Sequence, residues 1–487
     1  MKRTTRRILW GVAALVLVVL LPACEDKEET IEEPVDNPPE IQLTAPSGGE
    51  ALQPGSDLEI TWTATDDNGV VGVDLSYSSG GGVRVIATGL TGSSYSWGVP
   101  DANVFSMKII AVARDTKGQT GRDESDGYFA IIEHSALGYV GSTTCRNCHL
   151  SYYNETLTSG HPYVLNEVSG GPPSYPNSVV SDPPAGLTWD DIAYVIGGYG
   201  WQARFVTADS GWVMTDGIDG VNTQYNLPRS DLGGGLAAEW VAYNAGDTER
   251  KPYDCGSCHT TGWQDLTANG GVHQDGLIGI EGTWEETGVR CEACHGPGAN
   301  HVASQSPSDI TVDGSSAACG TCHVRGDPQI IPAGGGYISH EEQYNEISAG
   351  PHGGAVECGD CHEPHILTRY GNAAAGGITQ TCEDCHTVTL NHLPIDCESC
   401  HMPRATRSAR EVHSFEADVR THIFRINPDG NLTKADMFIN GGTEAADFIT
   451  LDFACYSCHT DPISLEGGGR SQKTMAELAN RAAGIHP

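Results

Sequence analysis

The chain has 487 residues, which is enough for two or three domains, and it is strongly acidic. Its 63 acidic and 27 basic residues give a formal net charge of −36 at pH 7. This excess makes nucleic acid an unfavourable partner and suits basic redox proteins or surfaces that carry bound cations.

Residues 1–24 are typical of an export leader. Four basic residues lie among the first seven, and residues 8–21 are uninterruptedly apolar, too short a stretch for a retained membrane helix. The ending Leu-Pro-Ala-Cys resembles a bacterial lipobox and predicts lipidation of Cys24, although Pro22 is unusual there. The alternative is an ordinary signal peptide with an incidental cysteine. Either leader predicts export, and the lipobox predicts an anchor in the bacterial envelope, in the outer membrane, facing the periplasm or at the cell surface.

Residues 25–40 differ from the rest of the chain in composition. They hold eight acidic residues, one lysine and three prolines, and they offer little that a core could bury. We therefore predict a disordered tether between the anchor and the first domain.

Residues 41–133 contain no cysteine and alternate between apolar and polar side chains in short runs. About seven such runs, separated by Gly, Asn and Asp clusters, predict an all-β sandwich with Trp62 and Trp97 in its core. The segment resembles immunoglobulin-like or fibronectin type III-like modules, which implies a spacing or docking role. The clusters at 66–69 and 115–118 would suit calcium, and turn chemistry accounts for them equally well.

Eight copies of Cys-x-x-Cys-His follow, numbered here as motifs 1 to 8 in chain order. Two thiols one turn apart can add to the vinyl groups of a haem, while the histidine binds the iron. Zinc ribbons and disulfide frameworks give no reason for a histidine after every pair. We therefore predict eight covalently bound haem c groups. The predicted attachment sites are Cys145 and Cys148, Cys255 and Cys258, Cys291 and Cys294, Cys319 and Cys322, Cys358 and Cys361, Cys382 and Cys385, Cys397 and Cys400, and Cys455 and Cys458. The predicted proximal ligands are His149, His259, His295, His323, His362, His386, His401 and His459.

Residues 138–487 form the predicted octahaem domain, with roughly 43 residues for each haem. So little protein predicts short helices and irregular connections around stacked porphyrins, with little sheet. Four tryptophans and strand-like runs predict a partly β insertion at 162–254, and 474–483 predicts a terminal helix. The expected fold class is thus an N-terminal all-β sandwich followed by a mainly α or irregular haem domain.

The remaining eleven histidines decide whether the second axial position of each haem is filled. A histidine at this position gives a six-coordinate iron suited to electron transfer, whereas an open position can bind substrate. Because His301 and His365 lie so close to a motif histidine, they are expected to serve neighbouring haems. His134, His273 and His413 are taken as surplus. The distal candidates are His161, His301, His340, His352, His365, His392, His422 and His486.

Several segments resemble one family of multihaem cytochromes. They are Tyr-Val-Gly-Ser-x-x-Cys-x-x-Cys-His at 139–149, Ser-Gly-His-Pro at 159–162, Cys-His-Gly-Pro-Gly at 294–298 and Cys-x-x-Cys-His-Met-Pro at 397–403. The resemblance is to the superfamily of the tetrahaem carriers of nitrifying bacteria, the octahaem hydroxylamine oxidoreductases and the octahaem nitrite and tetrathionate reductases. It implies stacked haem pairs and mainly bis-histidine ligation. Those reductases carry a lysine at the catalytic haem. Here every motif keeps its histidine, and the few lysines (Lys251, Lys434 and Lys473) lie outside the motifs.

The supply of histidines for the distal positions favours an envelope electron carrier, respiratory or extracellular, over an enzyme. Its expected partners are a quinol-linked donor and other cytochromes, with the membrane reached through the lipid; the oligomeric state stays open. The alternative is an oxidoreductase of small nitrogen or sulfur compounds at one open haem, roofed by the insertion near Arg204. An adhesion protein would leave the haems without a role.

Overall fold

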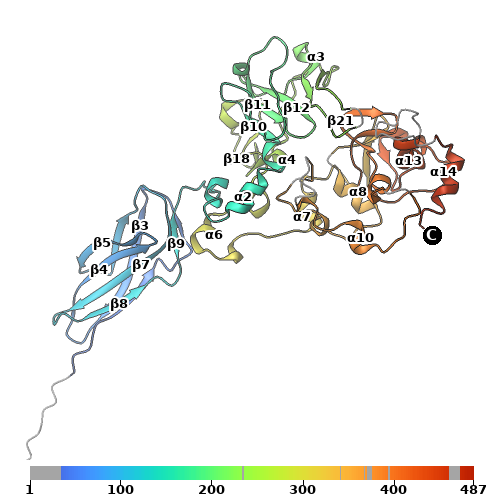
Figure 1. Cartoon of the computed structure of the whole chain (residues 1–487). Coiled ribbons are helices and arrows are strands. Elements are labelled where there is room, and N and C mark those ends of the chain that lie inside the picture. Colours follow the sequence, from blue (N-terminus) through green and yellow to red (C-terminus); the bar gives the residue numbers. More distant parts are fainter. Residues whose placement is uncertain are drawn as a thin grey trace, which may run out of the picture.

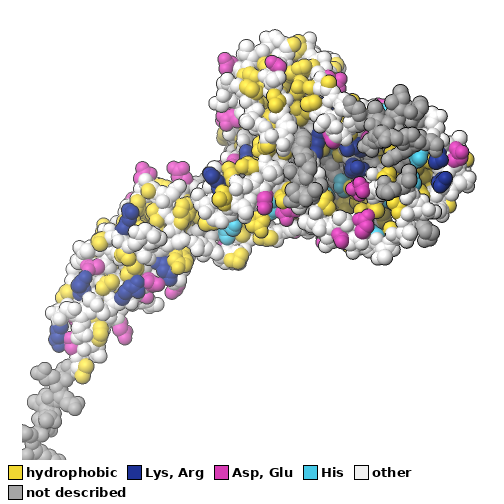
Figure 2. Space-filling model, viewed as in Figure 1, with side chains coloured by type: hydrophobic (Ala, Val, Ile, Leu, Met, Phe, Trp, Pro, Cys, Tyr) yellow, Lys and Arg dark blue, Asp and Glu magenta, His cyan; other side chains and the backbone are white. Residues whose placement is uncertain are grey.

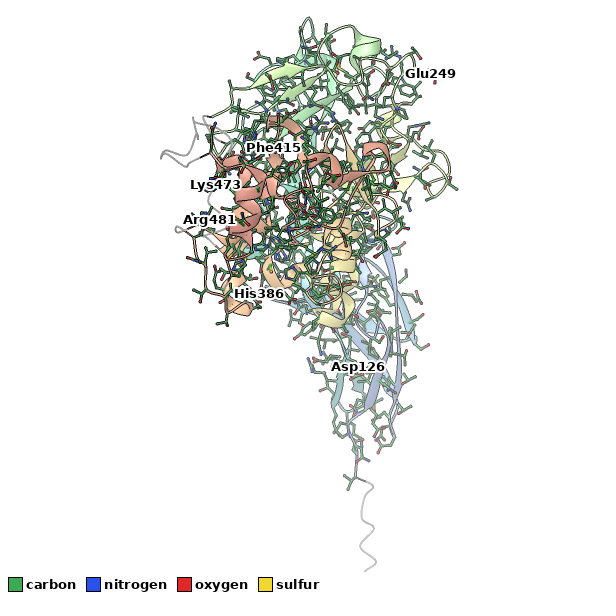
Figure 3. The ribbon with its side chains drawn as sticks, turned by 90° about the vertical axis from the view of Figure 1, so that its right-hand side faces the viewer. Asp126, Glu249, His386, Phe415, Lys473 and Arg481 are labelled. Atoms are coloured by element: carbon green, nitrogen blue, oxygen red, sulfur yellow. The ribbon has the colours of Figure 1, made fainter. Side chains whose placement is uncertain are left out.

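The computed structural model describes residues 35–486 except 233–234, 341, 367, 370–375, 393–394 and 460–471. These residues form an elongated molecule, with a β-sandwich at one end and the C-terminal region at the other (Figure 1). In the side view of Figure 3, Glu249 marks the insertion, Asp126 the sandwich, and His386 and Phe415 the C-terminal region. The leader, Cys24 and most of the tether lie outside the described residues. Within the described part, no helix combines the length and apolarity needed to cross a bilayer.

The predicted all-β sandwich is confirmed. One sheet has the order β1-β3-β6, and the other has the order β2-β9-β7-β4-β5 with β8 paired to β7. Three of the alternating runs expected to form strands, at 58–64, 71–77 and 107–113, fall inside β3, β4 and β7. The strands are β1 (Glu40–Ala45), β2 (Ala51–Leu52), β3 (Asp57–Thr65), β4 (Val70–Ser79), β5 (Gly82–Leu90), β6 (Ser94–Gly98), β7 (Val104–Asp115), β8 (Thr120–Glu124) and β9 (Phe129–Ile131).

Alternating side chains of the two sheets fill the core of the sandwich. Trp62 and Trp97 are buried there as predicted, together with Ile60, Leu75 and Met107. The Asp clusters serve the turns. Asp115, for example, accepts hydrogen bonds from the backbone N–H groups of residues 117 and 119 at 2.9 and 2.7 Å. Among the described residues, no three His, Cys, Asp or Glu side chains form a group that could hold a metal ion.

The sandwich docks on the haem region through helix α6 (Ala299–Ser304). Ala303 of this helix is fully buried against Ala130 and Ile132, and Phe105 and Val302 pack around them. A small side chain at 303 lets the helix lie close to β9. The contact sets the sandwich beside motifs 1 and 3, which precede α6 in the chain.

The insertion contains an antiparallel five-stranded sheet in the order β10-β11-β12-β13-β14. This agrees with the expected partly β character, although the strand-like run at 211–214 contributes only isolated bridges, from Val213 to Val206 and to Lys251. Two apolar clusters cover the faces of the sheet. The elements are β10 (Leu165–Glu167), β11 (Ile192–Gly197), β12 (Gln202–Thr207), α3 (Asp216–Asp219), β13 (Gln224–Asn226) and β14 (Glu239–Val241).

The expectation of little sheet in the haem region is wrong for 331–445. A six-stranded sheet in the order β22-β21-β20-β19-β24-β23 packs around Ile338, Met437 and Phe453. Most of its strands are too short to show alternation, and motifs 5 to 7 separate the segments that pair, so no local pattern announces them. The strands are β19 (Ile331–Gly334), β20 (Tyr337–Ser339), β21 (Thr406–His413), β22 (Glu416–Val419), β23 (Phe438–Ile439) and β24 (Glu444–Ala445).

Short elements make up the remainder, as expected. Two small hairpin pairs, β15 (Thr260–Thr261) with β18 (Glu286–Thr287) and β16 (Gln264–Asp265) with β17 (Gly282–Thr283), follow motif 2. Besides α3 and α6, the α-helices outside the motifs in the described residues are α2 (Leu150–Thr156), α8 (Gln343–Ala349), α12 (Lys434–Met437) and α14 (Met475–Ala482). Helix α14, capped by Thr474, confirms the predicted terminal helix.

Candidate haem sites

Motifs 1 to 7 each begin in or form a single helical turn, and motif 8 forms the end of a nine-residue helix. Capping supports several of these turns: the Thr381 hydroxyl and the Asp384 carboxylate form a capping box around motif 6, and Glu357 and Asp360 form another at motif 5. The motif helices are α1 (Ser142–Cys145), α4 (Gly256–His259), α5 (Cys291–His295), α7 (Ser316–Gly320), α9 (Cys358–Cys361), α10 (Cys382–Cys385), α11 (Cys397–His401) and α13 (Leu451–His459).

Seven motif histidines lie beside a second histidine from the distal candidates. Their ring centres are 5.8–6.4 Å apart. The pairs are His149–His301 (6.1 Å), His161–His323 (6.2 Å), His295–His365 (6.2 Å), His352–His386 (6.0 Å), His362–His422 (6.2 Å), His392–His459 (6.4 Å) and His401–His486 (5.8 Å).

These separations fit an iron atom between the two rings. A metal–imidazole bond of about 2 Å on each side, plus about 1 Å from each nitrogen to its ring centre, puts opposed rings about 6 Å apart. The partner never comes from the sequence next to the same motif. His301 follows motif 3 but lies beside motif 1, and His365 follows motif 5 but lies beside motif 3. Each pair thus joins a motif histidine to a histidine from a more distant part of the sequence.

Hydrogen bonds hold many of these rings by Nδ1. His295 and His401 contact the backbone carbonyls of Thr311 and Phe424 at 2.6 and 2.8 Å. On the partner side, His301 contacts the Ser306 carbonyl at 2.9 Å. An Nδ1–H held in this way leaves Nε2 with the lone pair that a metal ligand needs.

Burial keeps two partner histidines uncharged. Burial first, and neighbouring histidines second, lower the pKa of His161 to about 4 and the pKa of His422 to about 3. Both imidazoles are therefore neutral at pH 7, the state that can bind a metal.

The surplus histidines lie in other surroundings. His134 contacts backbone carbonyls with both ring nitrogens, at 3.0 and 3.3 Å. His413 accepts the Phe415 N–H and contacts the Glu416 carboxylate at 3.1 Å. His273 contacts the Ile280 carbonyl at 2.7 Å.

Motif 2 and the candidate His340 do not form such a pair. His259 contacts the Val164 carbonyl by Nδ1 at 3.0 Å, and the part of the chain that the structure describes places no second imidazole against its ring. The ring centre of His340 instead lies 4.8 Å from that of Trp201.

Contacts between thiols give the spatial order of the motifs. Hydrogen-bonding contacts join Cys145 to Cys291, Cys322 to Cys258, Cys319 to Cys358 and Cys382 to Cys397. Electrostatic interactions between near thiols join Cys294 to Cys319, Cys361 to Cys382 and Cys455 to Cys400. The motifs therefore follow one another in the order 1, 3, 4, 5, 6, 7, 8, with motif 2 beside motif 4.

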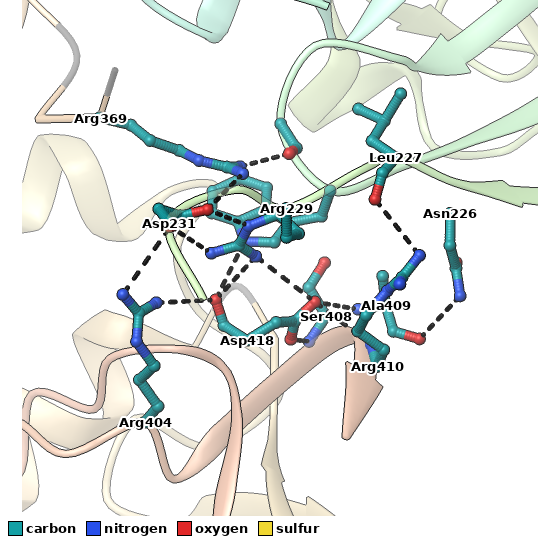
Figure 4. A network of polar contacts seen from close by, with 12 residues as sticks. Asn226, Leu227, Arg229, Asp231, Arg369, Arg404, Ser408, Ala409, Arg410 and Asp418 are labelled. Atoms are coloured by element: carbon teal, nitrogen blue, oxygen red, sulfur yellow. Dashed lines mark hydrogen bonds and ion pairs between the residues drawn. The ribbon is translucent and has the colours of Figure 1, made fainter. Parts of the chain in front are cut away.

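Sequence reasoning missed a buried arginine network that joins the insertion to the C-terminal sheet (Figure 4). Arg229, only 2% exposed, donates to the Asp418 carbonyl at 3.0 Å and to both carboxylate oxygens of Asp231 at 2.8 Å. Arg410 reaches back to two carbonyls of the insertion, and Arg404 lies 3.7 Å from Asp231. The spacing of three between arginines at 404, 407 and 410 is the one weak signal in the sequence.

The other residues named from the sequence take no part in the histidine pairs. Arg204 hydrogen-bonds Gln224 at 3.0 Å and lies over the Tyr243 ring. Lys434 contacts the Ser414 carbonyl at 2.6 Å and lies over the Tyr337 ring. Both are side chains of small polar and aromatic clusters.

The comparisons with known proteins agree with a two-part chain. The family model of the bacterial Ig domain matches residues 39–106. Multiheme cytochrome MtrA of Shewanella baltica (strain OS185) is 22% identical over 215 residues, which are 42% of this chain and 52% of that protein. The chain thus spans about half the length of this relative.

Two solved structures are also similar. Outer cell wall cytochrome OcwA superposes with a TM-score of 0.40 at 18% identity over 71% of this chain and 86% of the other. The fibronectin(III)-like modules of Clostridium thermocellum CbhA give a TM-score of 0.16 at 27% identity over 18% of this chain and 44% of theirs. Together with the motifs, the matches to the Ig model and to MtrA identify an immunoglobulin-like module joined to a multihaem cytochrome region.

Proposed function

We propose that the chain is an exported, lipid-anchored octahaem cytochrome that carries electrons between envelope redox proteins and a terminal acceptor. The observation that carries the proposal is the set of seven imidazole pairs, each with one motif histidine and each with room for one metal ion. The match to a multiheme cytochrome supports it.

The motif cysteines would hold each haem covalently, and the motif histidine would bind its iron from one side. At seven motifs the paired histidine would fill the other side. A bound haem supplies a one-electron couple. Two fixed imidazoles would leave no exchangeable position on the iron, and the iron would keep both ligands when it is reduced. The protein therefore favours electron transfer over substrate chemistry.

The order of the motifs supports conduction along the molecule. Neighbouring thiols mean that successive haem edges would lie close together, from motif 1 beside the sandwich to motif 8 at the far end. The acidic side chains in Figure 2 are spread over the molecule and form no single patch on that face. Partner docking is therefore expected at the two ends of the line, where the terminal motifs lie.

Export and anchoring rest on residues 1–24. The basic start, the apolar stretch and the cysteine at 24 would place the protein on the outer side of a bacterial membrane, where covalent haem attachment takes place. The acidic tether would then lift the sandwich and the haem region off the lipid surface.

The first test measures the number of haems per chain and how many of their irons carry two axial ligands. A pyridine haemochrome assay of the purified holoprotein should give about eight haems per chain, and electron paramagnetic resonance (EPR) should show mostly low-spin iron. His161→Ala should keep the haem count and convert one further iron to high spin, because it removes the partner of His323. His134→Ala, whose ring contacts backbone carbonyls, is the matched control and should leave the spectrum unchanged. Fewer than eight haems, or an unaltered spectrum in His161→Ala, would contradict the proposal.

A further inference from the structure

Motif 2 lies outside the line formed by motifs 1, 3, 4, 5, 6, 7 and 8. Its Cys258 contacts Cys322 of motif 4, and the Cys322 thiol also reaches the Ser257 carbonyl at 3.8 Å. The other cysteine of motif 4, Cys319, contacts Cys358 of motif 5. Motif 4 is thus a junction, and motif 2 lies beside it as a branch.

The branch also differs in its ligands. His259 is oriented like the other motif histidines, with Nδ1 held by the Val164 carbonyl. In the seven pairs the second imidazole lies about 6 Å away, but the remaining candidate, His340, packs on Trp201. Trp201 is fixed by its indole N–H to the Asp418 carbonyl at 3.4 Å, and Arg369 lies over its ring. His340 is therefore part of the junction between the insertion and the C-terminal sheet.

Apolar and aromatic side chains pack against motif 2, and the Asp254 carboxylate lies 3.5 Å from the Cys255 thiol. Cys255 packs against a buried cluster that includes Tyr253, and Trp263 lies so close to Gly256 that a Cβ there would fall 1.9 Å from its ring. The Tyr253 side chain is 1% exposed, and its hydroxyl has no hydrogen-bond partner among the described residues. A buried hydroxyl beside Cys255 and Cys258 that lacks a partner is costly, unless a group held at motif 2 accepts its hydrogen.

We propose that the haem at motif 2 is a side branch with an exchangeable sixth position, which takes a small uncharged ligand that binds iron through one atom. An apolar wall disfavours charged ligands, because an ion loses its hydration there, and one hydroxyl donor suits a small ligand with one acceptor atom. Electrons would reach this position through motif 4. The inference rests on the proposed function, since it requires a haem at each motif.

Carbon monoxide is the probe for the reduced holoprotein, and EPR reports the spin state of the oxidised one. The wild type should show about one-eighth of its iron in the high-spin state and bind about one CO per chain. Cys255→Ser with Cys258→Ser should lose one haem and all CO binding. Cys455→Ser with Cys458→Ser, the matched control at the end of the line, should lose one haem and retain CO binding. His340→Ala should leave the high-spin fraction unchanged.

The outcomes separate the two proposals. Eight haems that are all low-spin and bind no CO would overturn the branch site while leaving the electron carrier intact, whereas a lower haem count would overturn the carrier itself. CO binding that survives the loss of the motif 2 cysteines would place the open position elsewhere and overturn the assignment. Tyr253→Phe should shift the C–O stretching frequency of the bound CO, and an unshifted frequency would remove Tyr253 from the site.

Discussion

At the scale of single residues, buried carboxylates fix the backbone beside the candidate ligands. Glu346 is fully buried and accepts hydrogen bonds from the hydroxyls of Thr406 and Thr421 at 3.2 and 2.5 Å and from the His422 N–H. Burial raises the pKa of this carboxyl to about 7. Glu292 plays the same part before motif 1, where it accepts backbone N–H groups from residues 140, 141 and 298. Each carboxylate joins segments that are distant in the sequence.

Glu346→Gln should weaken the hydrogen bonds that this side chain accepts from Thr406, Thr421 and the His422 N–H, and it should displace His422. An amide presents an N–H₂ group to donors that a carboxylate satisfied, which costs about 1–3 kcal/mol for each unsatisfied buried group. We expect a lower melting temperature and an extra high-spin signal, because His422 is the partner of His362. Glu249→Gln, at an exposed position of the insertion, is the control. Equal melting temperatures and spectra for the two variants would show that Glu346 does not position His422.

The difference between motif and partner residues explains what the sequence can reveal. Cysteines and histidines within one motif are neighbours in the chain, so their chemistry is local and their spacing predicts it. The partner of His362 lies 60 residues further on, at His422, and Glu346 carries no local signature at all. Counting histidines predicted that partners exist, but which ring meets which motif depends on the tertiary fold.

At the scale of elements, the insertion is held by charge as well as by apolar packing. The arginine network crosses from the loop between β13 and β14 to β21 and β22, and its central Arg229 and Asp418 are almost fully buried. Burial acts to raise the pKa of Asp231, but the hydrogen bond and charge of Arg229, with Arg369 and Arg404, hold it well below its usual range. Asp231 is 43% exposed, so solvent screens part of this effect.

Asp231→Asn should loosen the insertion at neutral pH and lose its effect in acid. Because the folded state lowers the carboxyl pKa, the stabilisation is present above the ordinary value of 3.8 and is lost as the pH falls below it. Limited proteolysis should therefore cut 162–254 faster in the variant at pH 7, and the difference between the two proteins should shrink progressively as the pH falls below 3.8. Asp190→Asn, exposed in the same insertion, is the control. A difference that persists unchanged in acid would rule out this electrostatic cause.

Strand length and the sequence distance between paired strands explain both where strand prediction succeeded and where it failed. In the sandwich, strands such as β4 and β7 are long enough to alternate, and hairpin turns connect neighbours, so the pattern is visible along the chain. In the C-terminal sheet, β20 pairs with β21 across more than 60 residues that hold three motifs. Apolar contacts there form a side-chain core in a region where porphyrins were expected to make up much of the core.

At the scale of the whole molecule, the line of motifs 1, 3, 4, 5, 6, 7 and 8 runs from the sandwich towards the C-terminal end. Motif 1 follows the sandwich directly, helix α6 ties motif 3 to the sandwich, and motif 8 lies beside the terminal helix at the other end (Figure 1). An anchor at the N-terminus would thus place one end of the line near the membrane and the other away from it. A linear order also means that a single missing haem in the middle interrupts the path, whereas a missing branch does not.

Cys358→Ser with Cys361→Ser removes the attachment of the haem at motif 5 and tests this order. With the holoprotein bound to an electrode through its N-terminal end, the wild type should exchange the charge of all its haems at fast scan rates. The motif 5 variant should keep fast exchange only for motifs 1 to 4, because motifs 6 to 8 lie beyond the break. Cys255→Ser with Cys258→Ser should lose the charge of one haem and slow none of the others. Equal slowing in both variants would show that the haems do not conduct in the order of the thiol contacts, provided that the low-spin signals of the remaining pairs show both variants to be folded.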